Sequence, residues 1–178
     1  MLTKLKQFFS SRGGEAYLVG GYLRDSLLSL PAQDEVDIAV LADPQSTGRD
    51  LAFALAGDWK DYELWFAWRP EGDCLQLCCA LDLRVGKTRR PALHELIGLI
   101  NQRTWLGHFE LWSEDQEIVF RHALALPHGE RPTLSQAASM IDAAIDAADR
   151  YFPAFDYLVR GGRKPQDAID ACMFQTVG

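Results

Sequence analysis

The sequence lacks the long apolar runs of membrane proteins. None of its hydrophobic stretches approaches the roughly 18 residues that a membrane-spanning helix needs. Residues 1–17 contain lysines, but they have neither the apolar core nor the small-residue cleavage site of a secretory signal peptide. We therefore expect a cytoplasmic protein with no membrane partner.

Cysteine is scarce, and its spacing excludes the common cysteine sites. No two cysteines have the C-x-x-C spacing of zinc-binding or redox motifs. A chain of 178 residues can bury a sizeable core, so it needs no disulfide or metal to fold. The sequence therefore predicts reduced cysteines in a hydrophobic core. The four positions are Cys74, Cys78, Cys79 and Cys172.

Basic residues are in the minority. The chain has 18 lysines and arginines against 25 aspartates and glutamates, a net charge of −7. A broad nucleic-acid surface needs clustered positive charge, so such a partner is disfavoured. The charge does not exclude a small nucleotide bound at a local site. The length indicates one domain, or one domain with an appendage.

Hydrophobic alternation predicts the centre of the fold. In residues 105–126, two runs of alternating apolar residues flank the polar block 113–117, the pattern of a β-hairpin with one buried face. A turn at 70–73 predicts a second hairpin from residues 61–68 and 74–83. Residues 47–56 fit a helix and a strand equally well.

Helical spacing surrounds these hairpins. An apolar stripe behind Pro91 predicts a helix to about residue 102. Thr133 and Gln136 form the capping-box pattern of a long helix that Pro153 should kink or break. We expect Gly161 and Gly162 to end this segment and a short helix to follow over 165–174. Towards the N-terminus, the pattern predicts a helix at 2–11, a strand at 16–19, a helix at 22–29 and a strand at 35–41. The order predicts an α+β fold, in which an antiparallel sheet of hairpins packs against helices behind an N-terminal strand–helix–strand segment.

Residues 57–178 resemble the bacterial YbjN family. The words that carry the resemblance are DWKDY at 58–62, ALDL at 80–83, LIN at 99–101, WLGHFELW at 105–112, FRHAL at 120–124, YFPAF at 151–155 and FQTVG at 174–178. The resemblance implies a type III secretion chaperone-like α+β fold, a homodimer and a regulatory or stress-related role with no established catalytic activity. It therefore implies a protein-binding module that uses no cofactor.

The tryptophans suit an interface. All five lie between residues 59 and 112, and aromatic side chains commonly anchor protein interfaces. Most of them are expected to lie in the core or to cover the sheet. If the even-numbered residues of strand 61–68 face inward, Trp65 points to the other side. Trp65 is therefore the interface candidate.

Two histidines lie on the strands of the 105–126 hairpin. His108 and His122 could approach each other across the pair. No further metal ligands accompany them in the sequence, so ordinary strand histidines are expected.

Residues 17–40 suggest a different chemistry. A strand that ends in Gly20 and Gly21 and opens into a helix would expose N–H groups suited to a phosphate. Glu35 and Asp37 lie two residues apart, so in a strand they project to the same face. Paired carboxylates of this kind can hold the divalent metals of phosphoryl transfer. A strand–turn–helix that only packs on the sheet would explain the pattern equally well.

This segment resembles the head of tRNA CCA-adding enzymes and poly(A) polymerases. Their pattern L-V-G-G-x-x-R-D-x-L-L, then D-x-D-I-A, is matched at Gly20, Gly21, Arg24, Asp25 and Asp37. Glu35 replaces the first aspartate of the pair, a displacement that can cost about 100-fold in rate. The resemblance implies Mg²⁺ at Glu35, Asp37 and a third carboxylate, for which Asp82 is the candidate, and a nucleotide and a tRNA 3′ end as partners.

Two hypotheses follow. The first divides the chain into a nucleotidyltransferase-head-like segment at 1–56 and a YbjN-like α+β domain at 57–178 that binds protein without catalysis. The alternative is a Mg²⁺-dependent nucleotidyltransferase, which needs its three carboxylates within metal-sharing distance.

Overall fold

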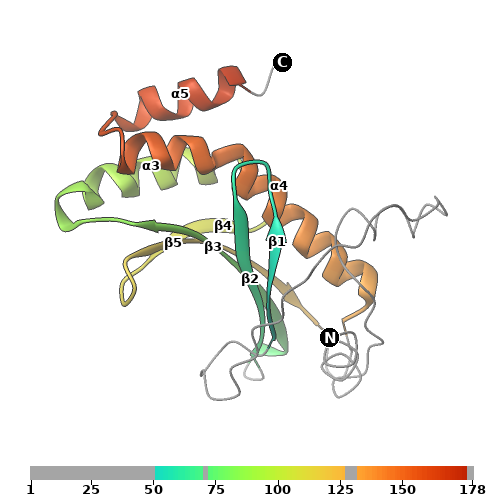
Figure 1. Cartoon of the computed structure of the whole chain (residues 1–178). Helices are drawn as coiled ribbons and strands as arrows, with labels where there is room; N and C mark the ends of the chain where they lie inside the picture. Colours follow the sequence, from blue (N-terminus) through green and yellow to red (C-terminus); the bar gives the residue numbers. More distant parts are fainter. Residues whose placement is uncertain (1–50, 70–71, 127–131, 176–178) are drawn as a thin grey trace. The chain divides into compact units, whose positions relative to one another are not determined.

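The computed structural model describes residues 51–69, 72–126 and 132–175 (Figure 1). The helices and strands expected at 2–11, 16–19, 22–29 and 35–41 lie outside these ranges. The described elements are, in order, β1 (Leu51–Ala56), β2 (Asp61–Arg69), β3 (Cys74–Arg84), the 3₁₀ turn η2 (Lys87–Arg89), α3 (Arg90–Asn101), β4 (His108–Trp112), β5 (Glu117–Ala125), α4 (Leu134–Val159) and α5 (Pro165–Gln175). None of the described helices has the length and apolar character to cross a bilayer.

The strands form one antiparallel sheet in the order β1-β2-β3-β5-β4, which confirms the predicted α+β class. The predicted 105–126 hairpin is confirmed, since β4 and β5 pair antiparallel with Phe109 opposite Phe120. Of the ambiguous stretch 47–56, the described residues 51–56 form strand β1. Apolar residues on neighbouring strands bury each other when they share a face, which is why the alternating runs pair in this register.

Two compact units divide the chain. Among the described residues, the first contains 51–55, 63–69, 72–77, 123–126 and 132–142, and the second contains 56–62, 78–122 and 143–175. In the first unit, the rings of Phe53 and Phe66 lie 6.0 Å apart in the core. The predicted capping box is confirmed there: the Thr133 N–H donates to Gln136 Oε1 at 2.8 Å, and the Gln136 N–H donates to Thr133 Oγ1 at 3.2 Å.

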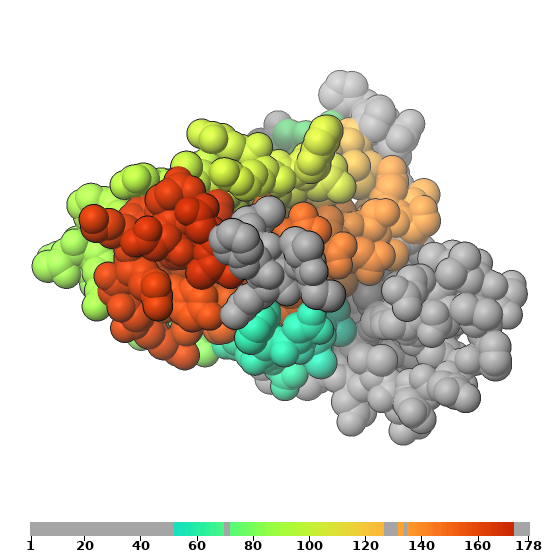
Figure 2. Space-filling model, turned by 90° about the horizontal axis from the view of Figure 1, so that it is seen from above, coloured from blue at the N-terminus to red at the C-terminus, as the bar shows by residue number. Residues whose placement is uncertain are grey.

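The core of the second unit is built around Phe109. Its ring lies 5.2 Å from that of Phe120, 6.0 Å from Tyr151 and 5.0 Å from Phe155. Edge-on and tilted contacts of this kind are favourable for aromatic rings. Helix α3 contacts α5 and β4, and the helices α3 and α5 lie side by side (Figures 1 and 2). The predicted stripe of α3 is confirmed, because its buried residues are Leu93, Leu96, Ile97 and Ile100.

Helix α4 runs through Pro153 to Val159, so of the kink or break predicted at Pro153, the break is wrong. The helix ends before the predicted glycine pair, where Gly162 has a φ of 66° and its N–H donates to the Leu158 carbonyl at 3.2 Å. The Arg89 guanidinium donates to the same carbonyl at 2.7 Å and also to that of Val159. A cation at a helix C-terminus is favourable because the last carbonyls carry partial negative charge.

All four cysteines are free thiols, as predicted. Three are buried, and Cys74 is partly buried. The Cys172 thiol donates to the Arg150 carbonyl at 2.6 Å.

Candidate functional site

In the second unit, Asp149 of α4 is hydrogen-bonded to the turn between β1 and β2. The carboxylate of Asp149 accepts hydrogen bonds from the Asp58 N–H and from the Tyr62 hydroxyl, each at 2.9 Å. Tyr62 is fully buried and its ring meets that of Phe152 edge-on at 6.3 Å. Residue 57 must be glycine, because a Cβ there would lie 2.6 Å from Asp149 Oδ1 and inside the Tyr62 ring.

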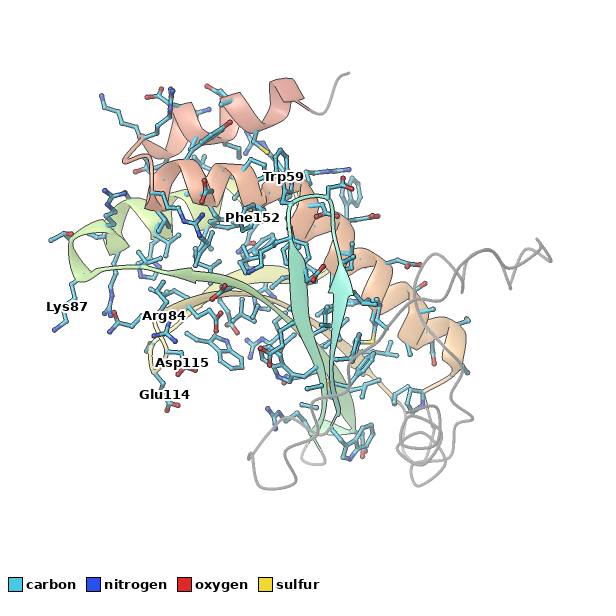
Figure 3. The ribbon with its side chains drawn as sticks, viewed as in Figure 1. Trp59, Arg84, Lys87, Glu114, Asp115 and Phe152 are labelled. Atoms are coloured by element: carbon cyan, nitrogen blue, oxygen red, sulfur yellow. The ribbon has the colours of Figure 1, made fainter. Side chains whose placement is uncertain are left out.

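Trp59 of this turn contacts α4 where one backbone hydrogen bond of the helix is missing. Proline has no N–H, so Pro153 cannot donate to the carbonyl four residues earlier, which is that of Asp149. The indole N–H of Trp59 donates to that carbonyl at 2.9 Å. Figure 3 labels Trp59 of this turn and Phe152 of α4. The indole therefore supplies the donor that the proline removes, which explains how α4 continues through Pro153.

The electrostatics of this cluster favour a structural role. Burial raises the pKa of Tyr62, and the nearby Asp149 carboxylate raises it further. Burial also raises the pKa of the Cys79 thiol, so the reactive thiolate is disfavoured. Burial raises the pKa of Asp149 above its ordinary value of 3.8. A buried, neutral Tyr62 hydroxyl and Cys79 thiol support a packed junction and not a nucleophile.

A second polar cluster lies on strands β4 and β5. The Glu110 carboxylate accepts a hydrogen bond from the Trp112 indole at 2.6 Å and pairs with the Arg121 guanidinium at 3.1 Å. His108 Nε2 lies 3.8 Å from Glu110 and 3.5 Å from Arg121. Burial lowers the pKa of His122, and the charge of His108 lowers it further. The part of the chain that the structure describes contains no group of three or more potential metal ligands, so the histidines form no metal site there.

The turn after α3 exposes a large aromatic side chain. Trp105 is 98% exposed and Leu106 is 54% exposed. Large apolar groups that face water together often mark an interaction site. We name this surface the Trp105 patch and define it by the residues that line a hollow of about 170 Å³: Arg103, Thr104, Trp105, Leu106, Ala143, Asp146, Ala147, Arg150 and Tyr151.

Local hydrogen bonds fix the turn that carries Trp105. The Thr104 hydroxyl donates to the Ile100 carbonyl at 3.0 Å, and the Arg103 guanidinium donates to the Leu99 carbonyl at 2.6 Å. On the other side of Trp105, Gly107 has a φ of 71°, where an L side chain would be strained. The turn thus has a defined conformation that holds the indole in solvent.

Asn101 joins this turn to the edge of the sheet. Its side-chain amide donates to the Phe109 carbonyl at 3.0 Å, and its side-chain oxygen accepts from the Phe109 N–H at 2.8 Å. Strand β4 is the last strand in the sheet order. The amide of Asn101 thus satisfies outward backbone groups that an edge strand would otherwise leave open.

A family model matches residues 35–156 of the chain. The chain belongs to the YbjN family. The description attached to that family is "Putative bacterial sensory transduction regulator". The match confirms the resemblance and begins at residue 35, so it includes Glu35 and Asp37.

The YbjN chain is also similar to a solved structure, "Crystal Structure of the ExsC-ExsE Complex". The identity is 15% and the TM-score is 0.39, with 85% of this chain and 90% of that chain covered. No curated protein matches the chain.

The structure places only one of the predicted catalytic carboxylates. In this YbjN chain, Asp82 pairs with Lys60 at 3.0 Å, and its side chain is 77% exposed. The ion pair accounts for Asp82 without a metal. The other residues of the nucleotidyltransferase hypothesis lie outside the described ranges: Gly20, Gly21, Arg24, Asp25, Glu35 and Asp37.

The interface candidate Trp65 is buried, with 1% of its surface exposed. It therefore lacks the exposed surface of an interface anchor, and Trp105 has that surface instead. Hydrophobic periodicity does not single out Trp105, because periodicity describes strands and helices and Trp105 lies in a turn. The sequence feature that marks this turn is Gly107, two residues after Trp105.

Proposed function

We propose that this YbjN-family chain is a non-enzymatic, cytoplasmic regulatory module that acts by binding protein through the Trp105 patch. The observation that carries the proposal is the 98% exposure of Trp105 beside a hollow of about 170 Å³. Tryptophan and arginine are the residues most enriched among the side chains that dominate interface energetics. The patch contains both types, since Arg103 and Arg150 line the same hollow.

Two further observations support the proposal. The buried Tyr62 and Cys79 are held in their neutral forms, which suits a structural junction. The four free thiols suit the reducing cytoplasm, because disulfides persist mainly in oxidising compartments.

The proposal is tested by photo-crosslinking in the cell that makes the protein. A photoreactive phenylalanine analogue replaces Trp105 in the full chain, and the matched control places the same analogue at Lys87, which is exposed in the same unit (Figure 3). We expect a discrete protein adduct from position 105 that position 87 does not give. Mass spectrometry of the adduct identifies the protein.

The identified protein is then titrated into the purified chain in a calorimeter. We expect Trp105→Ala to weaken binding by about 30-fold or more, the effect of removing an interface residue that contributes about 2 kcal/mol. The proposal fails if position 105 gives no adduct, if both positions give the same adducts, or if Trp105→Ala binds the identified protein as tightly as the unchanged chain.

A further inference from the structure

We infer that a second surface of the chain binds a short acidic segment of a protein partner. This surface, the basic cluster, consists of Arg89, Arg90, Arg160, Arg163 and Lys164. It goes beyond the proposed function, because it surrounds the start of α3, whereas the Trp105 patch follows the end of that helix. Within residues 89–90 and 160–164, five of the seven residues are basic and none is acidic, although the whole chain has a net charge of −7.

The fold brings the two segments of the basic cluster together from distant parts of the sequence. The Arg89 guanidinium donates to two carbonyls at the end of α4. A Cβ on Gly162 would lie 3.6 Å from a guanidinium nitrogen of Arg89, so the turn between α4 and α5 lies against this arginine. Lys164 is the first residue of that α5 end, since its carbonyl accepts from the Ala168 N–H at 3.0 Å. Helices α3 and α5 both begin here (Figure 1), while Lys87 points away from the α4–α5 turn (Figure 3) and lies outside the cluster.

The charges of the basic cluster are only partly neutralised within the chain. Arg160 pairs with Asp156 at 3.2 Å. Among the described residues, Arg90, Arg163 and Lys164 have no ion-pair partner, and the buried Nε of Arg90 has no hydrogen bond. Helix α3 also lacks an acidic residue in its first turn, although the N-terminus of a helix favours negative charge. Anionic groups from a partner would therefore reduce the repulsion within the cluster and satisfy the start of the helix.

The limited extent of the cluster favours the carboxylates of a protein over the phosphates of a nucleic acid. Four of its five residues are arginines, and a guanidinium can hold either group through two parallel hydrogen bonds. The Val85 N–H donates to the Gln116 carbonyl at 3.0 Å, so the turn with Glu114 and Asp115 lies beside the end of β3, a few residues before the cluster (Figure 3). A nucleic acid carries phosphates without interruption and would extend onto acidic surface. An acidic protein segment can end where the cluster ends.

Fluorescence anisotropy of a labelled octaglutamate peptide, titrated with the purified full chain, tests the inference. We expect binding in the micromolar range that weakens as salt is added, because salt screens exposed charges. Lys164→Glu should raise the dissociation constant by about fivefold or more, since it turns one attraction into a repulsion. The substitution places a carboxylate at the start of α5, where negative charge is favourable, so the urea midpoint of the variant should not fall.

The matched control is Arg84→Glu. It makes the same change in net charge at an exposed position of the same unit, outside the basic cluster. Because exposed charges are screened over about 8 Å at physiological salt, this variant should change the dissociation constant of the peptide by less than about twofold. A labelled polyuridine RNA is titrated in parallel, and we expect it to bind more weakly than the peptide.

Three outcomes would overturn the inference. The peptide does not bind, Arg84→Glu weakens its binding as much as Lys164→Glu does, or the RNA binds as tightly as the peptide or more tightly. None of these results bears on the proposed function, whose test reads the protein adduct at position 105. In the same way, the absence of that adduct would remove the proposed function and leave the basic cluster to be judged by the peptide titration.

Discussion

Removing the indole N–H of Trp59 should destabilise the chain through a helix that lies about ninety residues away in the sequence. The change is Trp59→Phe, which keeps an aromatic ring and removes the donor that reaches the Asp149 carbonyl at 2.9 Å. That carbonyl has no helical donor, because Pro153 stands four residues later. We expect the free energy of unfolding to fall by about 1 kcal/mol, the typical net contribution of one hydrogen bond.

The proline provides a specific test of this reason. Pro153→Ala restores an N–H that can donate to the Asp149 carbonyl within the helix. In that background, the loss of the indole donor should cost much less. The double-mutant cycle should therefore give a coupling energy between positions 59 and 153 of about 1 kcal/mol, above the roughly 0.3–0.5 kcal/mol within which independent sites add. Urea unfolding, monitored by far-ultraviolet circular dichroism, is measured for the unchanged chain, both single variants and the double variant.

Trp112→Phe is the matched control. It also removes an indole donor of the second unit, but that donor bonds Glu110 at 2.6 Å and has no relation to Pro153. Its cost should be the same with proline or alanine at position 153. Equal costs of Trp59→Phe in the two backgrounds would refute the idea that the indole replaces the missing helix hydrogen bond.

Two further predictions concern the β4–β5 hairpin. Asn101→Ala should cost about 2 kcal/mol in urea unfolding, because it leaves the N–H and C=O of Phe109 without their side-chain partner; unchanged exchange of the Phe109 amide in hydrogen-exchange measurements would contradict this role. His122 has a pKa below 6.5 in the folded chain, so the unfolded chain binds its proton more tightly and stability falls as the pH drops from 6.5 towards the folded pKa. His122→Gln should remove part of that loss, and unfolding curves that keep the same pH dependence would show that the histidine is not its source.

The sequence predicted those parts of the fold whose signals are local. Helix α3 was expected from Pro91 and an apolar stripe, and the structure buries that stripe. The capping box was expected from a threonine and a glutamine three residues apart, which a single helical turn brings together. The hairpin of β4 and β5 followed from alternation on both sides of a polar turn.

In strand β2, alternation did not predict which side chains are exposed. Alternation predicts one buried face, but residues 64–67 are all buried. When both faces of a strand are covered, periodicity no longer tells which side chain reaches the surface. This is why the choice of Trp65 as the exposed anchor followed logically from the pattern and still selected a buried residue.

The predicted break at Pro153 failed for a related reason. A proline removes one donor and crowds the preceding turn, and local reasoning treats the loss as final. Here the replacement donor comes from Trp59, which no local pattern connects with α4. The Asp149 contacts to Asp58 and Tyr62 are equally remote in sequence. Such bonds become visible only when the fold brings the turn and the helix together.

The two exposed tryptophans of the second unit separate stability from binding. Trp59 is 52% exposed, yet its N–H is bonded to α4, so its ring is part of the fold. Trp105 is 98% exposed, and its removal takes almost no contact from the folded chain. Trp59→Phe should therefore lower the free energy of unfolding and leave binding unchanged. Trp105→Ala should weaken binding and leave the free energy of unfolding unchanged. If Trp105→Ala instead destabilised the folded chain, the Trp105 side chain would contribute to the fold. That result would contradict the role of the Trp105 patch as a binding surface.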